Sequence, residues 1–358
     1  MILTRFDEHD SGAVMSAFSL IRPILFGLDP ELAHRFTINA LKVLPHKKSI
    51  AADSLLSLHC AGLAFPSPIG LAAGFDKDAE VAGPMLGLGF GFVEVGTLTP
   101  LPQDGNPKPR LFRLVEDEAV INRMGFNNGG QLAAHPRLAR ARGAGIIGVN
   151  VGANKDATDR IADYVTGVRA MADVADYLTI NISSPNTPGL RGLQDKGQLL
   201  DLLDAVRAAR GDAGPPLFLK LAPDLEAQAI DDIAEIAIPR VEALIISNTT
   251  LERPGLRSKF AREAGGLSGA PLGPLAHQRL SDFRRATGGA IPLIAAGGIA
   301  SATDAYARIR AGASLIQIYS AMVYHGPGLA RSISSGLKTL LLRDGFTNVS
   351  QAIGVDAR

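Results

Sequence analysis

Short apolar runs that end in glycine or polar residues recur along the chain from residue 58 onward. The runs are continuous rather than alternating, which is typical of strands buried on both faces of a parallel sheet. Eight of them form the main body: Ile69–Phe75, Phe92–Thr97, Ile146–Gly152, Tyr177–Ser183, Leu217–Ala222, Ala243–Thr249, Ile291–Gly298 and Leu315–Ser320. Because most are separated by alanine-rich helical pattern, they predict an α/β fold, a (β/α)8 TIM barrel. A doubly wound open sheet is the alternative.

Two hairpins are predicted outside the barrel strands. Residues 58–65 form a small hairpin ahead of the barrel. The long connection over residues 98–140 contains a second hairpin, in which Leu111–Val115 pairs with Ala119–Ile121. A connection of this length usually forms a functional lid or wall.

The chain divides into four parts. The first fourteen residues are polar and acidic without periodicity, so residues 1–15 are predicted to be a disordered leader, with Met15 as an alternative start. Residues 16–48 form an amphipathic helical module, residues 49–345 the barrel and residues 346–358 a tail.

Two helices are predicted in the module. In the first, apolar residues recur at helical spacing from Leu20 to Leu28, and Pro23 must lie in its first turn or kink it. Asp29 and Pro30 then form a helix start, Asp as the N-cap and Pro at the first helical position. Pro45 ends the second helix. Basic residues flank both apolar faces, so the pair either caps the barrel or lies on a membrane surface.

Composition narrows the function classes. A net charge of +1 argues against nucleic acid as a partner. The single cysteine, Cys60, excludes a disulfide framework or an iron–sulfur cluster held by this chain alone. No apolar run reaches the roughly 18 residues of a spanning helix. These observations indicate a soluble or peripheral protein in a reducing compartment.

Polar residues gather at the predicted carboxyl ends of the strands, where barrels place their active sites. The stretch Asn181–Gly189 turns from a strand into a loop stiffened by two prolines, and Ser184 is its only group placed to exchange a proton. Lys77 follows the first predicted strand, and Lys220 lies at the end of the fifth. Glycines after strand seven and the Tyr319-Ser320 pair after strand eight are typical of a barrel phosphate site.

The kind of cofactor is constrained by what is missing. No Gly-x-Gly-x-x-Gly opens a helix, which argues against a bound nicotinamide dinucleotide. The histidines are scattered, so no metal site is predicted. The two lysines suit the anionic positions of a flavin and a carboxylate, while a Schiff-base role for Lys220 stays open.

Four runs together resemble dihydroorotate dehydrogenase: Ala72–Lys77, Asn122–Asn128, Asn181–Gly189 and Gly265–Gly269. The likeness extends from about residue 16 to about residue 340, in the same order and spacing. The resemblance is to the quinone-dependent class 2 branch of the family. Ser184 stands where class 1 enzymes have cysteine, and class 2 members carry an N-terminal helix pair.

The resemblance implies a role for each matching position. FMN contacts would come from Ala73, Gly74, Phe75, Asp76, Lys77, Thr97, Asn150, Asn181, Lys220, Ser247, Gly269, Gly298, Tyr319 and Ser320. Dihydroorotate would be held by Lys77, Asn122, Arg123, Met124, Gly125, Phe126, Asn181, Asn186, Asn248 and Thr249, with Ser184 as the base. His34 and Arg113 match the quinone site. Ser247 departs from the threonine of many relatives but keeps the hydroxyl.

The same resemblance implies oxidation of dihydroorotate to orotate, with electrons passed to a membrane quinone, in pyrimidine biosynthesis. It implies a monomer at an anionic membrane surface, on the cytoplasmic face of a bacterial inner membrane. A serine is a weak base, and a relay through Thr187 is one hypothesis for its activation. Two other functions stay open: an FMN barrel reductase with a cysteine base, and a non-catalytic membrane-surface scaffold.

Overall fold

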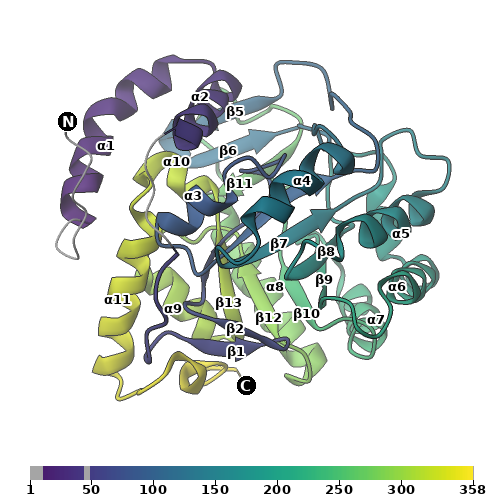
Figure 1. Ribbon diagram of the computed structural model, residues 1–358. Coiled ribbons are helices and arrows are strands. Elements are labelled where there is room, and N and C mark those ends of the chain that lie inside the picture. The colour runs from purple at the N-terminus through teal and green to yellow at the C-terminus, as the bar shows by residue number, and fades with distance from the viewer. Residues whose placement is uncertain (1–10, 44–48, 358) are drawn as a thin grey trace.

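Eight parallel strands close into a barrel in the computed structural model, which describes residues 11–43 and 49–357 (Figure 1). Closure is complete because the last strand pairs with the first, Ile316 lying opposite Ile69. Around the barrel the strands are β3 (Ile69–Leu71), β4 (Phe92–Leu98), β7 (Ile146–Val151), β8 (Tyr177–Asn181), β9 (Leu217–Leu221), β10 (Ala243–Ile246), β12 (Leu293–Ala296) and β13 (Ala313–Ile318). The predicted (β/α)8 barrel is confirmed, each strand lying within or largely overlapping its predicted run, and the open-sheet alternative is excluded.

Aromatic rings packed against glycines fill the lower part of the barrel. A Cβ atom at Gly70 would lie 2.2 Å from the Phe92 ring, and one at Gly148 would lie 2.0 Å from the Tyr177 ring. The Tyr177 ring also stacks on Phe218, with ring centroids 4.3 Å apart. These side chains are buried. The strand interiors therefore form a close-packed core, and open space is left only nearer the carboxyl ends.

Helices surround the barrel (Figure 1). They bury an apolar stripe and expose a charged one; in α6, for example, Leu199, Leu202 and Val206 are buried. The helices that follow the N-terminal pair are α3 (Ala82–Gly87), α4 (Gln131–Ala141), α5 (Arg160–Met171), α6 (Lys196–Arg210), α7 (Ala227–Ala237), α8 (Gly273–Thr287), α9 (Ala302–Arg310), α10 (Ser320–His325) and α11 (Leu329–Arg343). Short 3-10 turns are η1 (Val115–Asp117), η2 (Leu190–Gln194), η3 (Ala270–Leu272) and η4 (Val349–Ala352).

Both predicted hairpins are present. β1 (Leu58–Cys60) pairs with β2 (Leu63–Phe65), and β5 (Leu111–Leu114) pairs with β6 (Ala119–Asn122). A third strand that the pattern did not predict, β11 (Gly266–Gly269), joins β6 and completes a small antiparallel sheet. Leu267 packs against apolar residues of this hairpin in a separate small core. Two of the four residues of β11 are glycines, which give no strand signal.

The N-terminal module consists of α1 (Ser11–Gly27) and α2 (Pro30–Val43), which lie to one side of the barrel at the upper left of Figure 1. Asp29 caps α2 as predicted, because its carboxylate accepts from the backbone N–H groups of Glu31 and Leu32, both at 3.0 Å. Pro23 lies in the interior of α1, not in its first turn.

The predicted leader is shorter than expected. Helix α1 begins at Ser11, so residues 11–15 are helical, and residues 1–10 lie outside the described residues. The predicted helix end at Pro45 also lies outside them. The segment from residue 346 is packed against the barrel, since Val349 is buried and its N–H donates to the Leu55 carbonyl at 2.8 Å.

Candidate functional site

A cavity of about 530 Å³ opens at the carboxyl ends of the barrel strands. Its inner wall is polar and comes from strand ends, including Asn181, Lys220 and Ser247. Its outer wall is largely apolar and comes from the small antiparallel sheet and from α1 and α2. The strand-end residues singled out from the sequence therefore meet in one space that continues to the N-terminal helices.

Most of the predicted site residues line this cavity. Those that do are Ala73, Gly74, Phe75, Lys77, Thr97, Asn181, Ser184, Lys220, Ser247, Gly269, Gly298, Tyr319 and Ser320, together with Asn122, Met124, Gly125, Phe126, Asn186, Asn248, Thr249, His34 and Arg113. Asp76, Asn150 and Arg123 are the predicted residues that do not.

Side-chain contacts explain two of these three exceptions. The Asp76 carboxylate accepts from the N–H groups of Glu80 and Val81, at 2.7 and 2.8 Å, and so holds the loop before α3. Burial raises the pKa of Asp76 to about 6, and these two hydrogen bonds oppose that rise. The Arg123 guanidinium donates to Glu263 at 2.8 Å. Neither charged group faces the cavity.

Asn150 lies directly behind the cavity wall and orders it. Its amide oxygen accepts from the Thr97 hydroxyl at 2.6 Å and from the Asn181 amide at 3.0 Å. Asn181 Nδ2 also donates to the Thr97 hydroxyl at 2.9 Å. All three side chains are buried, so this cluster is a fixed pattern of donors and acceptors rather than a set of mobile polar groups.

Ser184 stands apart from the other polar groups of its loop. Its side chain is 5% exposed, and its hydroxyl oxygen accepts from the Asn186 N–H at 3.2 Å. The Asn186 amide in turn donates to Asn122 at 3.3 Å, which links the loop after β8 to the end of β6. The Thr187 hydroxyl, in the proposed relay, is buried without a hydrogen-bond partner among the described residues.

Two buried or partly buried lysines supply positive charge. Lys77 Nζ donates to the Gly74 carbonyl at 2.7 Å, and burial lowers the pKa of Lys77 to about 8. Burial also lowers the pKa of Lys220, and the Glu94 carboxylate opposes this shift. Both ammonium groups line the cavity, which therefore suits anionic groups.

Glycines bring two loops of the proposed phosphate region into close contact. A Cβ atom at Gly298 would lie 2.2 Å from Gly273 Cα, at the start of α8, and Gly298 has a φ of +67°. Gly269 also needs a positive φ, +95°, beside the Glu118 carbonyl. Only glycine fits both positions. Ser320 lies nearby, with its hydroxyl 2.7 Å from that of Ser268.

The two predicted quinone-site residues lie near the helical end of the cavity. The His34 ring packs edge-on against Phe75, with centroids 5.2 Å apart. Burial, reinforced by the Lys77 charge, lowers the pKa of His34 to about 3, so the ring is neutral at neutral pH. The Arg113 guanidinium donates to the Leu25 and Leu28 carbonyls at the end of α1. Arg113 therefore also anchors α1 to β5.

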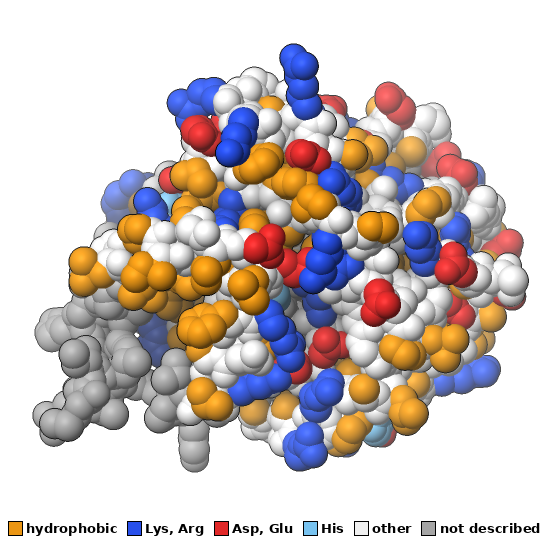
Figure 2. All heavy atoms as spheres, turned by 90° about the horizontal axis from the view of Figure 1, so that it is seen from above, with side chains coloured by type: hydrophobic (Ala, Val, Ile, Leu, Met, Phe, Trp, Pro, Cys, Tyr) orange, Lys and Arg blue, Asp and Glu red, His pale blue; other side chains and the backbone are white. Residues whose placement is uncertain are grey.

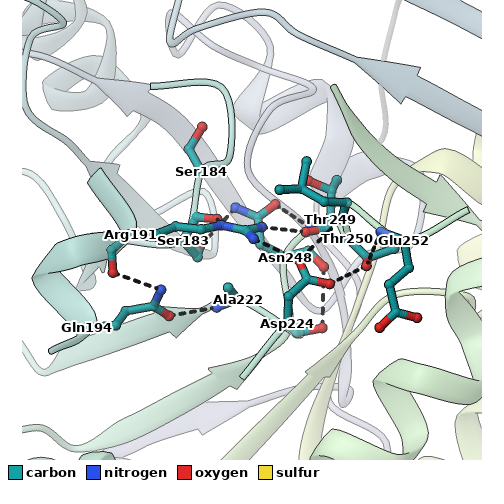
Figure 3. A network of polar contacts seen from close by, with 12 residues as sticks. Ser183, Ser184, Arg191, Gln194, Ala222, Asp224, Asn248, Thr249, Thr250 and Glu252 are labelled. Carbon is teal, nitrogen blue, oxygen red and sulfur yellow. Dashed lines mark hydrogen bonds and ion pairs between the residues drawn. The ribbon is translucent and has the colours of Figure 1, made fainter. Parts of the chain in front are cut away.

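Sequence reasoning missed several residues that support the site. Glu94, in the middle of β4, is completely buried, and its acid inside an apolar run was a usable signal. Gln317 lines the cavity and donates to Glu94 at 2.7 Å. Arg191 and Asp224 tie together the loops around Ser184 (Figure 3). No pattern pointed to that pair, because Arg191 lies in the short 3-10 turn η2 and Asp224 in a loop, neither of which has a regular apolar period.

The closed barrel with a polar cavity at its strand ends places the protein among the (β/α)8 barrel enzymes. Within that class, the chain belongs to the dihydroorotate dehydrogenase family, whose family model matches residues 55–341.

Individual relatives agree with this assignment. A Dihydroorotate dehydrogenase (quinone) of Erythrobacter litoralis is 64% identical over 339 residues, covering 94% of this chain and 99% of the relative. One of Sphingopyxis alaskensis is 61% identical, covering 96% and 98%. The crystal structure of DHODH in complex with ferulenol from Eimeria tenella has a TM-score of 0.88 at 42% identity, covering 94% of this chain and 99% of that one.

Proposed function

We propose that the protein oxidises dihydroorotate to orotate with FMN and passes the electrons to a membrane quinone, in pyrimidine biosynthesis. The family and the names of the relatives support this reaction. The observation that carries it is the single cavity with a polar inner end and an apolar outer end. One space of this kind suits a water-soluble substrate and a lipid-soluble acceptor that exchange electrons through one cofactor.

The donor set fits FMN. Gly269, Gly298, Tyr319 and Ser320 would hold its phosphate, because the glycines leave backbone groups open at the start of helical segments. Lys220 and the ordered amides would face its ring system. A Cβ atom at Gly74 would lie 3.3 Å from the Tyr319 ring, so this wall is close-packed. When bound, the flavin supplies a two-electron acceptor for hydride.

Dihydroorotate would lie between the amides and Ser184. Asn122, Asn181, Asn186 and Asn248 offer the uncharged donors and acceptors that a ring with several amide groups requires. The Lys77 ammonium would bind the substrate carboxylate in a charge-assisted contact. Ser184 would remove the proton from the ring carbon, since it is the buried hydroxyl of the loop that lines the cavity and points away from the supporting network (Figure 3).

The quinone would enter between α1 and α2. Apolar lining residues of these helices include Phe18, Ile21, Leu25 and Leu41. A neutral His34 adds a polar group there without the cost of a buried charge. Arg113 would act there partly by holding α1 in place, because its terminal nitrogens donate to the carbonyls of Leu25 in α1 and of Leu28 directly after it.

We further propose that the N-terminal helices bind an anionic membrane surface, as a peripheral monomer on the cytoplasmic face of a bacterial inner membrane. Hydrophobic side chains gather on the left of Figure 2, where these helices lie. The most exposed of them are Leu20, Ile24, Leu32, Phe36 and Val43. None of the described helices has the length and hydrophobicity needed to span a bilayer.

Absorbance spectroscopy followed by an activity assay tests the proposal. The purified protein should show flavin bands, which dihydroorotate bleaches and a quinone restores. A protein that stays colourless after addition of FMN would support the scaffold alternative instead. The cysteine-base alternative has no residue to serve it at this site, because Cys60 lies in β1 and does not line the cavity.

A further inference from the structure

Glu94 is a carboxylate sealed inside the barrel, beneath the proposed flavin and substrate site. It lies in β4 with 0% exposure and does not line the cavity. Oε1 accepts from the Asn150 amide at 2.8 Å. Oε2 accepts from three donors, Tyr177 at 3.2 Å, Thr179 at 3.1 Å and Gln317 at 2.7 Å. Four donors from β7, β8 and β13 thus converge on one buried anion.

A continuous chain of side-chain hydrogen bonds runs from Glu94 to the loop after β10. Asn150 donates to Glu94, and Asn181 donates to Asn150. The Ser183 hydroxyl donates to Asn181 Oδ1 at 2.9 Å. Asn248 Nδ2 then donates to the Ser183 hydroxyl at 2.9 Å (Figure 3). Every bond in this chain points toward the carboxylate.

The carboxylate fixes that direction. An ionised acid only accepts hydrogen bonds, so the Asn150 amide must turn its NH₂ group toward Glu94 and its oxygen toward Thr97 and Asn181. Asn181 must then turn its own oxygen toward Ser183. Amides in a neutral cluster can reverse together, whereas a chain that ends on a buried anion has one arrangement.

The same carboxylate acts on Lys220. The Glu94 charge favours the protonated form of this buried lysine, against the effect of burial. The titratable groups that face Glu94 from the surrounding strands are Lys220 of β9 and Tyr177 of β8. Burial and Glu94 both raise the pKa of Tyr177, which therefore stays neutral. Lys220 lines the cavity, whereas Glu94 lies behind its wall.

We infer that Glu94 is a positioning residue, which orients the Asn150, Asn181 and Asn248 amides toward flavin and substrate. This inference rests on the proposed function. Glu94 lies outside the cavity, yet it sets the direction of the hydrogen bonds made by the amides of the cavity wall.

Glu94→Gln is the sharpest test, because it keeps the shape and removes the charge. With its NH₂ group toward Asn150, the new amide faces a donor, whereas toward the other side the Tyr177 or Thr179 hydroxyl or the Gln317 amide must turn to accept from it. Either arrangement removes the charge-assisted bond that fixes the Asn150 amide. We expect orotate and FMN each to bind about tenfold or more weakly, the effect of losing a hydrogen bond to a charged group.

A pH signature separates positioning from packing. Without Glu94 the pKa of Lys220 falls further, so Lys220 loses its proton as pH rises and FMN affinity should fall with it. Glu94→Asp keeps the anion but withdraws it from Asn150, so orotate affinity should fall about threefold or more while FMN affinity stays independent of pH. Thr179→Val is the matched control: it removes one donor to Oε2, leaves the Asn150 bond intact and should change orotate affinity less than either.

The measurements are FMN content and affinity between roughly pH 6 and pH 9, orotate titration of the flavin spectrum, and the thermal midpoint of each variant. A wild-type protein that binds no FMN would overturn the proposed function. A flavin-loaded wild type beside a folded Glu94→Gln variant with unchanged affinities and pH profile would overturn the Glu94 inference alone. If Glu94→Gln does not fold, a normal orotate affinity in Glu94→Asp overturns it.

Discussion

Arg191 and Asp224 form an ion pair, 2.7 Å between Nη1 and Oδ2, that joins the loops after β8 and β9 (Figure 3). The other guanidinium nitrogens of Arg191 donate to the Ser183 carbonyl at 3.1 Å and to the Thr249 carbonyl at 3.0 Å. Arg191 therefore holds both the residue next to Ser184 and the start of the loop after β10. Asp224 keeps the guanidinium in that orientation.

This relationship predicts the effect of Arg191→Lys. Lysine keeps the charge but cannot make three bonds in one plane, so the Ser184 loop loses its attachment to the β10 loop. We expect FMN to be retained and flavin reduction to slow by about 10–100-fold, because misplacement near 1 Å has that cost. Rapid mixing with dihydroorotate measures it. The exposed pair Lys196–Asp232 provides a control, since Lys196→Ala should leave the rate unchanged.

Ser184→Ala tests the base directly. We expect bound FMN and orotate affinity to be kept, and flavin reduction by dihydroorotate to slow by roughly 10²–10⁴-fold. Thr187→Val tests the relay in the same assay and should give a smaller loss. A Ser184→Ala variant that bleaches within about tenfold of the normal rate would remove Ser184 from the role of base.

Substitution of Lys220 and of Lys77 should weaken the binding of different ligands. Lys220→Ala should lose FMN, whereas Lys77→Ala should keep FMN and lose orotate affinity through the carboxylate contact. Flavin content and orotate titration of both variants distinguish the two roles. Normal FMN content in Lys220→Ala together with normal orotate binding in Lys77→Ala would refute both assignments.

Lys77 also predicts a pH dependence. Its pKa is lowered to about 8, so the ammonium is charged below that pH and loses its proton above it. Orotate affinity should therefore be constant below about pH 8 and fall as pH rises through it. The bound orotate carboxylate stabilises the charged lysine, so the pKa of Lys77 is higher in the orotate complex than in the free protein. Orotate titrations across this range should show no such fall in Lys77→Ala.

Membrane binding can be tested without removing the helices. Leu20 and Ile24 are 78% and 71% exposed, so Leu20→Glu and Ile24→Glu should leave the fold intact and abolish sedimentation with anionic vesicles. Turnover with a long-tailed quinone should fall, while flavin reduction stays normal. Leu132, on α4 and 89% exposed, provides the control substitution Leu132→Glu. Binding should weaken with salt, because the basic residues are screened.

Deletion of residues 1–48 should lower the stability of the protein without unfolding the barrel. The barrel strands are complete without them, so we expect a folded protein that binds FMN and is reduced by dihydroorotate. Ile38 of α2 is part of the main core, however, and Arg110, 7% exposed, pairs with Glu31 at 2.6 Å. The truncated protein should therefore have a lower thermal midpoint. Unfolding or loss of FMN on truncation would show that the helices are integral to the barrel.

The barrel and most of the cavity lining were predictable because both follow from local pattern. A buried parallel strand is a mainly apolar run, and polar residues gather near its carboxyl end, as at Asn181 and Lys220. What could not be predicted depends on contacts between distant segments. β11 is a strand because β6 lies beside it. The direction in which Arg123 points is set by Glu263, 140 residues away.

The glycine–aromatic pairs of the barrel floor also constrain how this sequence can change. The Phe92 ring fills the space beside Gly70, and the Tyr177 ring fills the space beside Gly148 on the neighbouring strand. A Cβ atom at either glycine would lie 2.2 or 2.0 Å from the ring, respectively. Neither glycine can gain a methyl group while its partner ring stays in place. Each pair is thus expected to evolve as a unit, a larger residue at one position accompanying a smaller one at the other, so that substitution histories at these paired positions are coupled.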